Sequence, residues 1–198
     1  MYNVACIDLE GVLVPEMWPH IAAATGLSEL NLTTREVSDY ARLVEVRIRL
    51  LREHGIRLTD LQTLVETLEP MAGACAFVER LQQSYRVVLV SDAFLEMVLP
   101  LWHKLGEPEL QCHHFECDAA GYIVQPHYVR RGGKQEALLP FQGCRTLAVG
   151  DAFNDLSMLR AASQGFLFRP SAETRAAATG LPVAYDYLDV LQGVGLTV

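Results

Sequence analysis

Two short acidic segments carry carboxylates in a spacing that suits phosphoryl transfer. The segment DLEGV places Asp8 and Glu10 two residues apart, and the segment GDAFND begins at Gly150 and carries Asp151. A phosphomonoester dianion repels an attacking carboxylate, so a divalent cation must lie between the two. Mg²⁺ prefers octahedral oxygen coordination. Asp8 and Asp151 can contribute one oxygen each to it, and the backbone carbonyl of Glu10 can contribute a third.

Other polar residues can handle the phosphate and the protons. Ser91 can hydrogen-bond a phosphate oxygen, and Lys134, in the glycine-flanked run RRGGKQEAL, can neutralise phosphate charge. Glu10, on the turn beside the attacking carboxylate, can act as general acid toward the leaving oxygen and then as general base toward the acceptor. Asn154 and Asp155 can hold magnesium waters and orient Lys134.

Each of these residues also has an ordinary structural explanation. Asp155 can be an acid at a helix N-terminus that the helix dipole favours. Ser91 can be a buried hydroxyl bonded to the backbone, and Lys134 can be a solvated lysine. Either acidic segment alone would also fit an ordinary loop. All four groups together, in chain order and at the ends of apolar runs, favour the active-site interpretation.

Short apolar runs precede three of the four groups and are expected to be buried strands. The expected strands are residues 4–8, 86–91, 145–150, 165–168 and 183–185. Amphipathic helical patterns lie at residues 73–83, 94–105 and 155–162. This alternation predicts an α/β fold of the doubly wound, Rossmann-like type with a mostly parallel sheet. Ligand sites in such sheets lie beyond the carboxyl ends of the strands, where Asp8, Ser91 and Asp151 fall.

Two stretches break the alternation. Residues 15–70 contain almost no strand signal and three helical segments, at 17–25, 37–54 and 60–68, with Gly26 and Gly55 as helix stops. A helical insertion after the first strand would form a cap over the carboxyl edge of the sheet. Residues 111–128 suggest a β-hairpin with its turn at 118–121. The predicted domains are therefore a catalytic core of residues 1–14 and 71–198 and a cap of residues 15–70.

Composition restricts the kinds of partner. The chain has 198 residues, of which 51% are hydrophobic, and a formal net charge of −8. This acidity argues against a nucleic-acid partner. The N-terminal apolar run is interrupted by Asp8 and Glu10, so it is neither a signal peptide nor a membrane span, and a cytoplasmic location with no membrane partner is expected. Five irregularly spaced cysteines fit reduced thiols. The oligomeric state stays open between a monomer and a homodimer.

The four groups resemble, in order and spacing, the four motifs of the haloacid dehalogenase superfamily. They are DLEGV, the run ending in Ser91, Lys134 and GDAFND. The run GDAFNDLSML is similar to the phosphoserine phosphatase form of the fourth motif, and the resemblance extends over nearly the whole chain, including the helical cap. Within the family, DLEGVLVPE and RIRLLREHGIRL most resemble the bacterial phosphoserine:homoserine phosphotransferases, which also hydrolyse phosphoserine.

The resemblance implies a role for each motif residue. Asp8 is the expected nucleophile, which becomes an aspartyl-phosphate, and Glu10 is the expected acid/base. Most of the superfamily has Asp at the position of Glu10. Ser91 and Lys134 are the expected phosphate ligands. The residues expected around Mg²⁺ are Asp8, Glu10, Asp151 and Asp155.

The resemblance also implies where the rest of the substrate binds. Glu16 and Arg47 fall where phosphoserine phosphatases hold the amine and the carboxylate of the substrate, and Arg49 competes with Arg47 for the second role. The second motif reads SDAF, where these phosphatases typically have SGGF. Asp92 and Asn154 complete the expected substrate contacts.

The expected function is Mg²⁺-dependent phosphoryl transfer from L-phosphoserine to water, to homoserine, or to both. A phosphatase for another small phosphomonoester is an alternative, although a sugar phosphate would not need the charge pair of Glu16 and an arginine. A signalling receiver domain also has a phosphorylated Asp, but there it ends the third strand and no cap follows the first. A catalytically inactive binding protein is disfavoured by the intact Asp8, Lys134 and Asp151.

Overall fold

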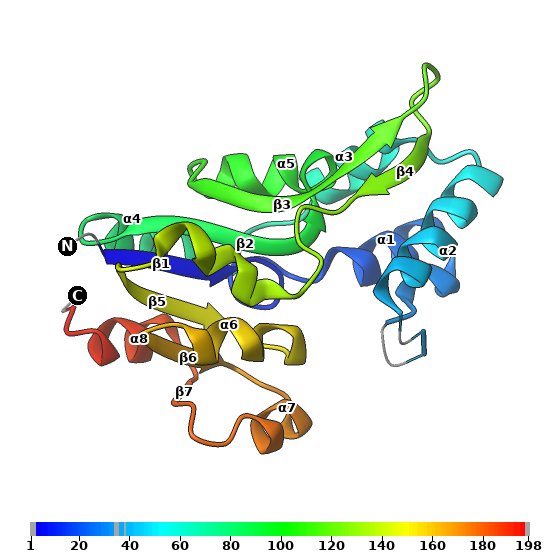
Figure 1. Ribbon diagram of the computed structural model, residues 1–198. Helices are drawn as coiled ribbons and strands as arrows, with labels where there is room; N and C mark the ends of the chain where they lie inside the picture. Colours follow the sequence, from blue (N-terminus) through cyan, green and yellow to red (C-terminus); the bar gives the residue numbers. More distant parts are fainter. Residues whose placement is uncertain (1–2, 34–35, 38, 197–198) are drawn as a thin grey trace.

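A seven-stranded sheet forms the centre of the computed structural model, which describes residues 3–33, 36–37 and 39–196 (Figure 1). The strand order is β4-β3-β2-β1-β5-β6-β7, and all neighbouring pairs are parallel except β3 and β4. The strands are β1 (Asn3–Asp8), β2 (Arg86–Phe94), β3 (Glu109–Cys117), β4 (Ile123–His127), β5 (Arg145–Gly150), β6 (Gln164–Phe168) and β7 (Val183–Ala184). The predicted doubly wound, mostly parallel α/β fold is confirmed.

The central strand β1 is buried on both faces, as expected where helices cover a parallel sheet on either side. Successive side chains of a strand point to opposite faces. Val4 and Cys6 accordingly belong to one buried cluster, and Ala5 and Ile7 belong to the other. Asp8 ends this strand between β2 and β5, so its carboxylate lies at the middle of the carboxyl edge.

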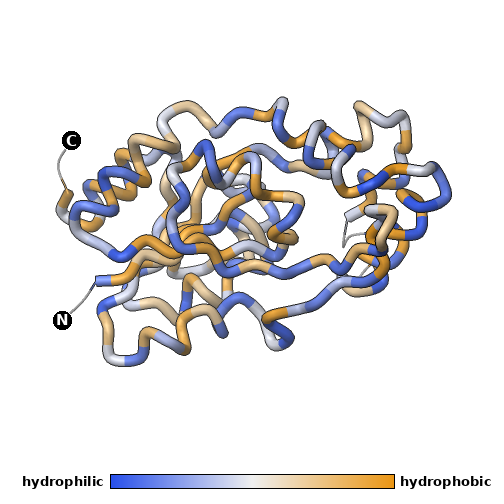
Figure 2. The backbone as a smooth tube through the Cα atoms, turned by 90° about the horizontal axis from the view of Figure 1, so that it is seen from above, coloured by the Kyte–Doolittle hydropathy of each residue, from blue (hydrophilic) through white to orange (hydrophobic). Residues whose placement is uncertain are grey.

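Helices cover both faces of the sheet. The first face carries α4 (Ala74–Gln82), α5 (Leu95–Lys104) and α8 (Tyr187–Gly193), and the second carries α6 (Leu156–Ala161) and the 3₁₀ segment η2 (Lys134–Phe141). Figure 2 shows apolar residues concentrated along the strands in the interior. The remaining elements of the core are η3 (Phe153–Asp155) and α7 (Ala172–Ala177). Within the described residues, no helix is both long and apolar enough to span a bilayer.

Three helices and a short 3₁₀ turn lie between β1 and α4, at the far end of the molecule from α8 (Figure 1). They are α1 (Met17–Thr25), η1 (Ser28–Asn31), α2 (Tyr40–Glu53) and α3 (Leu58–Glu66). Gly26 ends α1 in the left-handed conformation, with φ 73°. The predicted start of the second helix at residue 37 is wrong: the Asp39 carboxylate accepts hydrogen bonds from the amides of Ala41 and Arg42, and the helix begins at Tyr40. The domain limits at residues 15 and 70 stay a prediction.

The hairpin predicted within residues 111–128 is formed by β3 and β4, which pair antiparallel. The sequence did not reveal that β3 also pairs in parallel with β2 and so extends the main sheet. The hairpin turn touches the helices that follow β1. The amide of Leu58 donates to the carbonyl of Gly121 at 3.0 Å, and Arg52 pairs with Asp118 at 3.1 Å.

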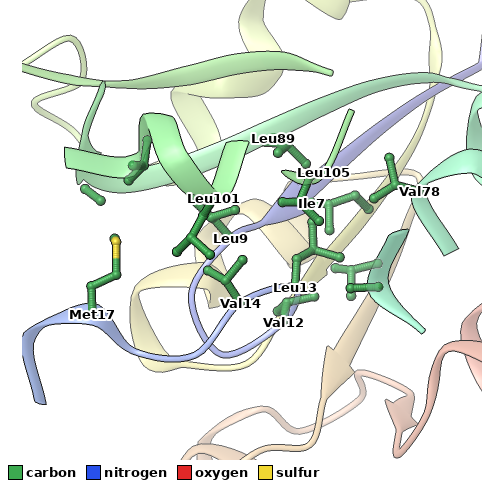
Figure 3. Packing of buried hydrophobic residues seen from close by; sticks show 14 of the residues in the cluster. Ile7, Leu9, Val12, Leu13, Val14, Met17, Val78, Leu89, Leu101 and Leu105 are labelled. Atoms are coloured by element: carbon green, nitrogen blue, oxygen red, sulfur yellow. The ribbon is translucent and has the colours of Figure 1, made fainter. Parts of the chain in front are cut away.

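The loop after β1 is supported from behind by packed side chains. Figure 3 shows Leu9 and Val14 of this loop beside Leu101 of α5, and all three belong to one buried cluster. From α8, the hydroxyl of Tyr187 donates to the carbonyl of Val12 at 2.7 Å. The Tyr187 ring also stacks on two phenylalanines, Phe77 at 4.6 Å and Phe168 at 5.1 Å between centroids. The backbone next to Asp8 is therefore held by buried apolar side chains and by the Tyr187 hydrogen bond.

Candidate active site

Asp8 and Lys134 meet at the carboxyl edge of the sheet. The Lys134 Nζ atom lies 2.6 Å from Asp8 Oδ1 and 2.6 Å from Asp155 Oδ1, and all three side chains are buried. Burial by itself lowers the pKa of Lys134, but the carboxylates of Asp155 and Asp8 outweigh it and hold that pKa well above its ordinary value. The buried lysine is therefore charged, as the phosphate neutralisation expected of it requires.

Three carboxylates form a cluster that suits a divalent cation. Oxygens of Asp8, Asp151 and Asp155 lie within 4.8 Å of one another. Asp151 Oδ1 is buried without a hydrogen-bond partner in the described part of the chain. Burial first, and then the charge of Asp155, raises the pKa of Asp8 well above its ordinary value and that of Asp151 to about 7. A hard cation would relieve this repulsion with its preferred oxygen ligands, so the residues fit Mg²⁺.

Gly11 leaves the space that the cluster needs. A Cβ atom built at Gly11 would lie 2.4 Å from Asp151 Oδ2, and the residue has φ +79°. Only glycine meets both conditions without strain. The two acidic segments are thus in direct contact, one at the end of β1 and one at the end of β5.

The Asp155 carboxylate holds Lys134 and the backbone of the fourth motif together. Its Oδ1 accepts from Lys134, and its Oδ2 accepts from the backbone amides of Asp151 and Ala152 at 2.9 Å each. The prediction that Asp155 orients Lys134 is therefore supported by a direct contact between the two side chains. A role of Asp155 as a metal ligand stays a prediction.

Glu10 lies on the loop between the core and α1. Its Oε1 accepts a hydrogen bond from the amide of Met17 at 2.9 Å, at the first turn of α1. Burial, followed by the negative charge of Glu16, raises the pKa of Glu10 to about 7. A carboxyl group with a pKa near the working pH can both give and take a proton, as an acid/base residue must.

Ser91 and Asp92 form the second motif at the end of β2. Ser91 is buried, and its Oγ accepts from the amide of Ala93 at 3.1 Å, which leaves its O–H free to be donated. Both carboxylate oxygens of Asp92 are already engaged, one by Arg130 at 3.1 Å and the other by Asn154 at 2.9 Å. The Asn154 amide thus reaches Asp92 rather than Lys134. Substrate contacts by these two residues stay a prediction.

Two cationic residues of α2 differ in the side of the helix that they occupy. Arg47 is buried, donates to the carbonyl of Leu32 at 2.8 Å and lies over the Trp18 ring. Its charge lowers the pKa of Glu10, so it acts on the loop that carries this residue. Arg49 is exposed and pairs with Glu53 at 3.8 Å. The structure therefore brings Arg47, and not Arg49, toward the site.

Glu16 immediately precedes α1 and is exposed to solvent. Its charge raises the pKa of both Glu10 and Asp151, so it too acts on the site. Glu16 and Arg47 therefore carry opposite charges that both act on Glu10, and a zwitterion could use both.

Arg130 and Tyr40 were missed from the sequence. The Tyr40 hydroxyl of α2 donates to the carbonyl of Asp92, which joins the helical insertion to the second motif. The guanidinium of Arg130 donates to the Ser91 carbonyl as well as to the Asp92 side chain. A signal for Arg130 was present in the basic pair that precedes the two glycines of RRGGK.

The fold and the site together are a mostly parallel doubly wound sheet with a cluster of acids at its carboxyl edge. A family model for haloacid dehalogenase-like hydrolases matches residues 2–163. The chain belongs to this family.

Individual relatives have names more specific than that of the family. The chain is 39% identical over 190 residues to phosphoserine phosphatase ThrH of Pseudomonas aeruginosa, which covers 95% of this chain and 93% of the relative. It is 42% identical over 168 residues to a phosphoserine phosphatase of Pseudomonas syringae pv. tomato, with 84% and 71% covered. The crystal structure of a phosphoserine phosphatase from T. onnurineus superposes with a TM-score of 0.75 at 25% identity, covering 100% of this chain and 96% of the other.

Proposed function

We propose that the chain is a Mg²⁺-dependent enzyme that transfers the phosphoryl group of L-phosphoserine to water, to homoserine or to both, through an aspartyl-phosphate on Asp8. The observation that carries the proposal is the buried contact of Lys134 with Asp8 beside the unpaired Asp151 oxygen. The names of the two Pseudomonas relatives support phosphoserine as the phosphoryl donor.

The first half-reaction uses Asp8 and Glu10. An Asp8 oxygen attacks phosphorus, a new P–O bond to Asp8 forms, and the bond between phosphorus and the serine oxygen breaks. Glu10 gives its proton to that leaving oxygen. Ser91 and Lys134 hold the phosphoryl oxygens. A Mg²⁺ ion held by the carboxylates of Asp8 and Asp151 and by the Glu10 carbonyl would supply positive charge between the nucleophile and the dianion.

The second half-reaction reverses the proton flow. Glu10 takes a proton from water or from the homoserine hydroxyl, whose oxygen then attacks phosphorus. The P–O bond to Asp8 breaks, which restores the carboxylate and releases inorganic phosphate or homoserine phosphate. Arg47 and Glu16 would bind the carboxylate and the ammonium group of the amino acid, because their charges are opposite and both act on the Glu10 loop.

The test is phosphate release from a panel of small phosphomonoesters, with and without Mg²⁺ and with and without homoserine. Asp8→Asn replaces the nucleophile by a near-isosteric amide and should lower turnover by roughly three orders of magnitude or more. Asp60→Asn, at an exposed position on α3, makes the same chemical change away from the site and should leave turnover unchanged. An Asp8→Asn protein that keeps a substantial part of the wild-type rate would contradict the aspartyl-phosphate route.

Beryllium fluoride with Mg²⁺ gives an independent test, because it forms a mimic of a phosphorylated carboxylate. It should inhibit the wild type. Insensitivity of the wild-type protein to beryllium fluoride would count against a phosphorylated Asp8.

A further inference from the structure

A gap in the sheet lies beside the second motif. The parallel pairing of β2 and β3 continues to Val90 and Gln111 and resumes only at Phe94 and His113. Between these pairs β2 has three residues, 91–93, and β3 has only residue 112. The strand therefore bulges where it carries Ser91, and the ladder cannot satisfy every backbone carbonyl there.

The guanidinium of Arg130 fills this gap. It donates to the carbonyl of Ser91 on β2, and to the carbonyl of Gln111 on β3 at 3.1 Å. Arg130 is 7% exposed, although arginine is rarely buried. A planar fork with several donors bridges two strands at a fixed geometry, which the compact ammonium of a lysine on its flexible stem does not reproduce.

Arg130 also fixes the side chain of Asp92, the residue that follows Ser91. It donates to Asp92 Oδ1 at 3.1 Å, while Asn154 of the fourth motif donates to Asp92 Oδ2 at 2.9 Å. One chain of contacts thus runs from the segment before Lys134, through the second motif, to the fourth motif. Three of the four motifs are connected through Arg130 and Asp92.

We propose that Arg130 is a positioning residue that holds the bulged Ser91–Asp92 segment in register with Lys134 and the fourth motif, so that the Ser91 hydroxyl meets the phosphoryl group. The inference rests on the proposed phosphoryl transfer. Since Arg130 acts on the phosphate-binding segment, its loss should affect every phosphomonoester equally, whatever the alcohol part.

The experiment compares Arg130→Ala with Arg131→Ala, which removes the same type of side chain one position along at an exposed site. The substrates are phosphoserine and p-nitrophenyl phosphate, which has no amino-acid group, and rates are corrected for the folded fraction from near-UV circular dichroism. Arg130→Ala should lower kcat/KM about 100-fold on both substrates, the effect of a misplacement of about 1 Å. It should also weaken inhibition by inorganic phosphate. Arg131→Ala should change neither.

Chemical rescue of the Arg130→Ala activity distinguishes a positioning role of Arg130 from a role in folding stability alone. Guanidinium chloride at low millimolar concentration should restore part of the activity of Arg130→Ala and none in Arg131→Ala. Arg130→Lys should remain at least about tenfold impaired, because the ammonium lacks the planar fork that reaches all three acceptors at once. If Arg130→Ala does not fold, Arg130→Lys takes its place and should show its loss equally on both substrates.

The outcomes are distinct. If the wild type is active and the folded Arg130→Ala protein, or Arg130→Lys where it takes its place, is fully active as well, this inference alone is overturned. A loss of rate that equals the loss of folded protein, with no rescue by guanidinium, overturns it as well. A wild-type protein inactive on both substrates overturns the proposed function.

Discussion

The guanidinium of Arg47 lies over the indole ring of Trp18, with its central carbon 4.3 Å from the ring centroid. Arg47 is buried, which lowers its pKa to about 10, so the group is still charged at neutral pH. Stacking on an aromatic face holds a guanidinium plane while its edge stays free to donate. Trp18 therefore holds the Arg47 guanidinium in place, as the proposed binding of a substrate carboxylate requires.

Arg47→Ala should raise KM for phosphoserine much more than KM for p-nitrophenyl phosphate. A lost charge-assisted pair in a desolvated site costs about 2–4 kcal/mol, and only when the substrate carries the partner charge. Arg49→Ala, on the exposed face of the same helix, is the matched control and should leave both values unchanged. Equal losses on the two substrates would show that Arg47 is structural, and a selective loss in Arg49→Ala would reverse the assignment.

Gly11→Ala should abolish activity, whereas Gly26→Ala should not. Both glycines have a similar positive φ, 79° and 73°, so alanine brings a comparable backbone strain of about 1–2 kcal/mol to each. The new Cβ at position 26 meets nothing within 4 Å, but at position 11 it would lie 2.4 Å from Asp151. Chemical unfolding and Mg²⁺-dependent phosphate release measure the two effects separately. Retained activity in a folded Gly11→Ala protein would show that Asp151 can move without loss.

His113 should make the protein less stable in mild acid. Burial first, and then the charge of Arg130, lowers the pKa of His113 from 6.5 to about 4 in the folded protein. The unfolded chain therefore binds this proton as the pH falls through 6.5, and the folded chain binds it only near 4. The free energy of unfolding therefore has its full value above pH 6.5. Protonation of His113 in the unfolded chain lowers it by about 3 kcal/mol between pH 6.5 and pH 4.

His113→Asn should remove that part of the pH dependence, because asparagine can still accept from the amide of Val129 and does not titrate. His114→Asn is the control, since His114 is exposed and adjacent. Urea unfolding of the three proteins between pH 4 and pH 7 gives the comparison. Parallel pH profiles for wild type and His113→Asn would contradict the assignment.

Glu10→Asp should shift the partition of the phosphoryl group from homoserine toward water. Glu has one methylene more than Asp, so its carboxylate lies roughly one bond length further from the backbone that fixes it and is less closely aligned. An alcohol that is held in place can compensate for imperfect alignment of the base better than a mobile water can. Glu10 therefore tolerates a bound alcohol better than Asp would, and the shorter base favours water in relative terms.

The measurement is the ratio of homoserine phosphate to inorganic phosphate formed from phosphoserine at a fixed homoserine concentration. An active Glu10→Asp protein with an unchanged ratio would place acceptor choice in the helices after β1. A wild type that makes no homoserine phosphate would leave a plain phosphoserine phosphatase.

The sheet and the acidic centre could be predicted because their signals are local. Apolar runs that end in Asp8, Ser91 or Gly150 are short enough to be strands, and parallel strands bring such ends to one edge. That Lys134 and Asp8, 126 residues apart, belong to one site followed from the motif order, but their direct contact was not predicted.

The role of Arg130 could not be predicted, because it depends on backbone atoms. Two of its partners are the carbonyls of Ser91 and Gln111, and they come into reach only through the bulge in β2. No residue type marks such a carbonyl. The engagement of both Asp92 oxygens was hidden for a related reason, because Asn154 reaches Asp92 from η3 and Arg130 reaches it from the loop between β4 and η2.

The hydrogen bond from Tyr187 to the carbonyl of Val12 joins residues that are 175 positions apart. On the ribosome, the loop that carries Asp8 and Glu10 emerges early, while the residue that supports it from behind is among the late ones. β6 and β7, which α8 contacts, also follow this loop in the sequence. The support behind the loop therefore forms only after the chain has grown by 175 residues beyond Val12. A nascent chain stalled before Tyr187 would lack the hydrogen bond that holds the loop carrying Asp8 and Glu10.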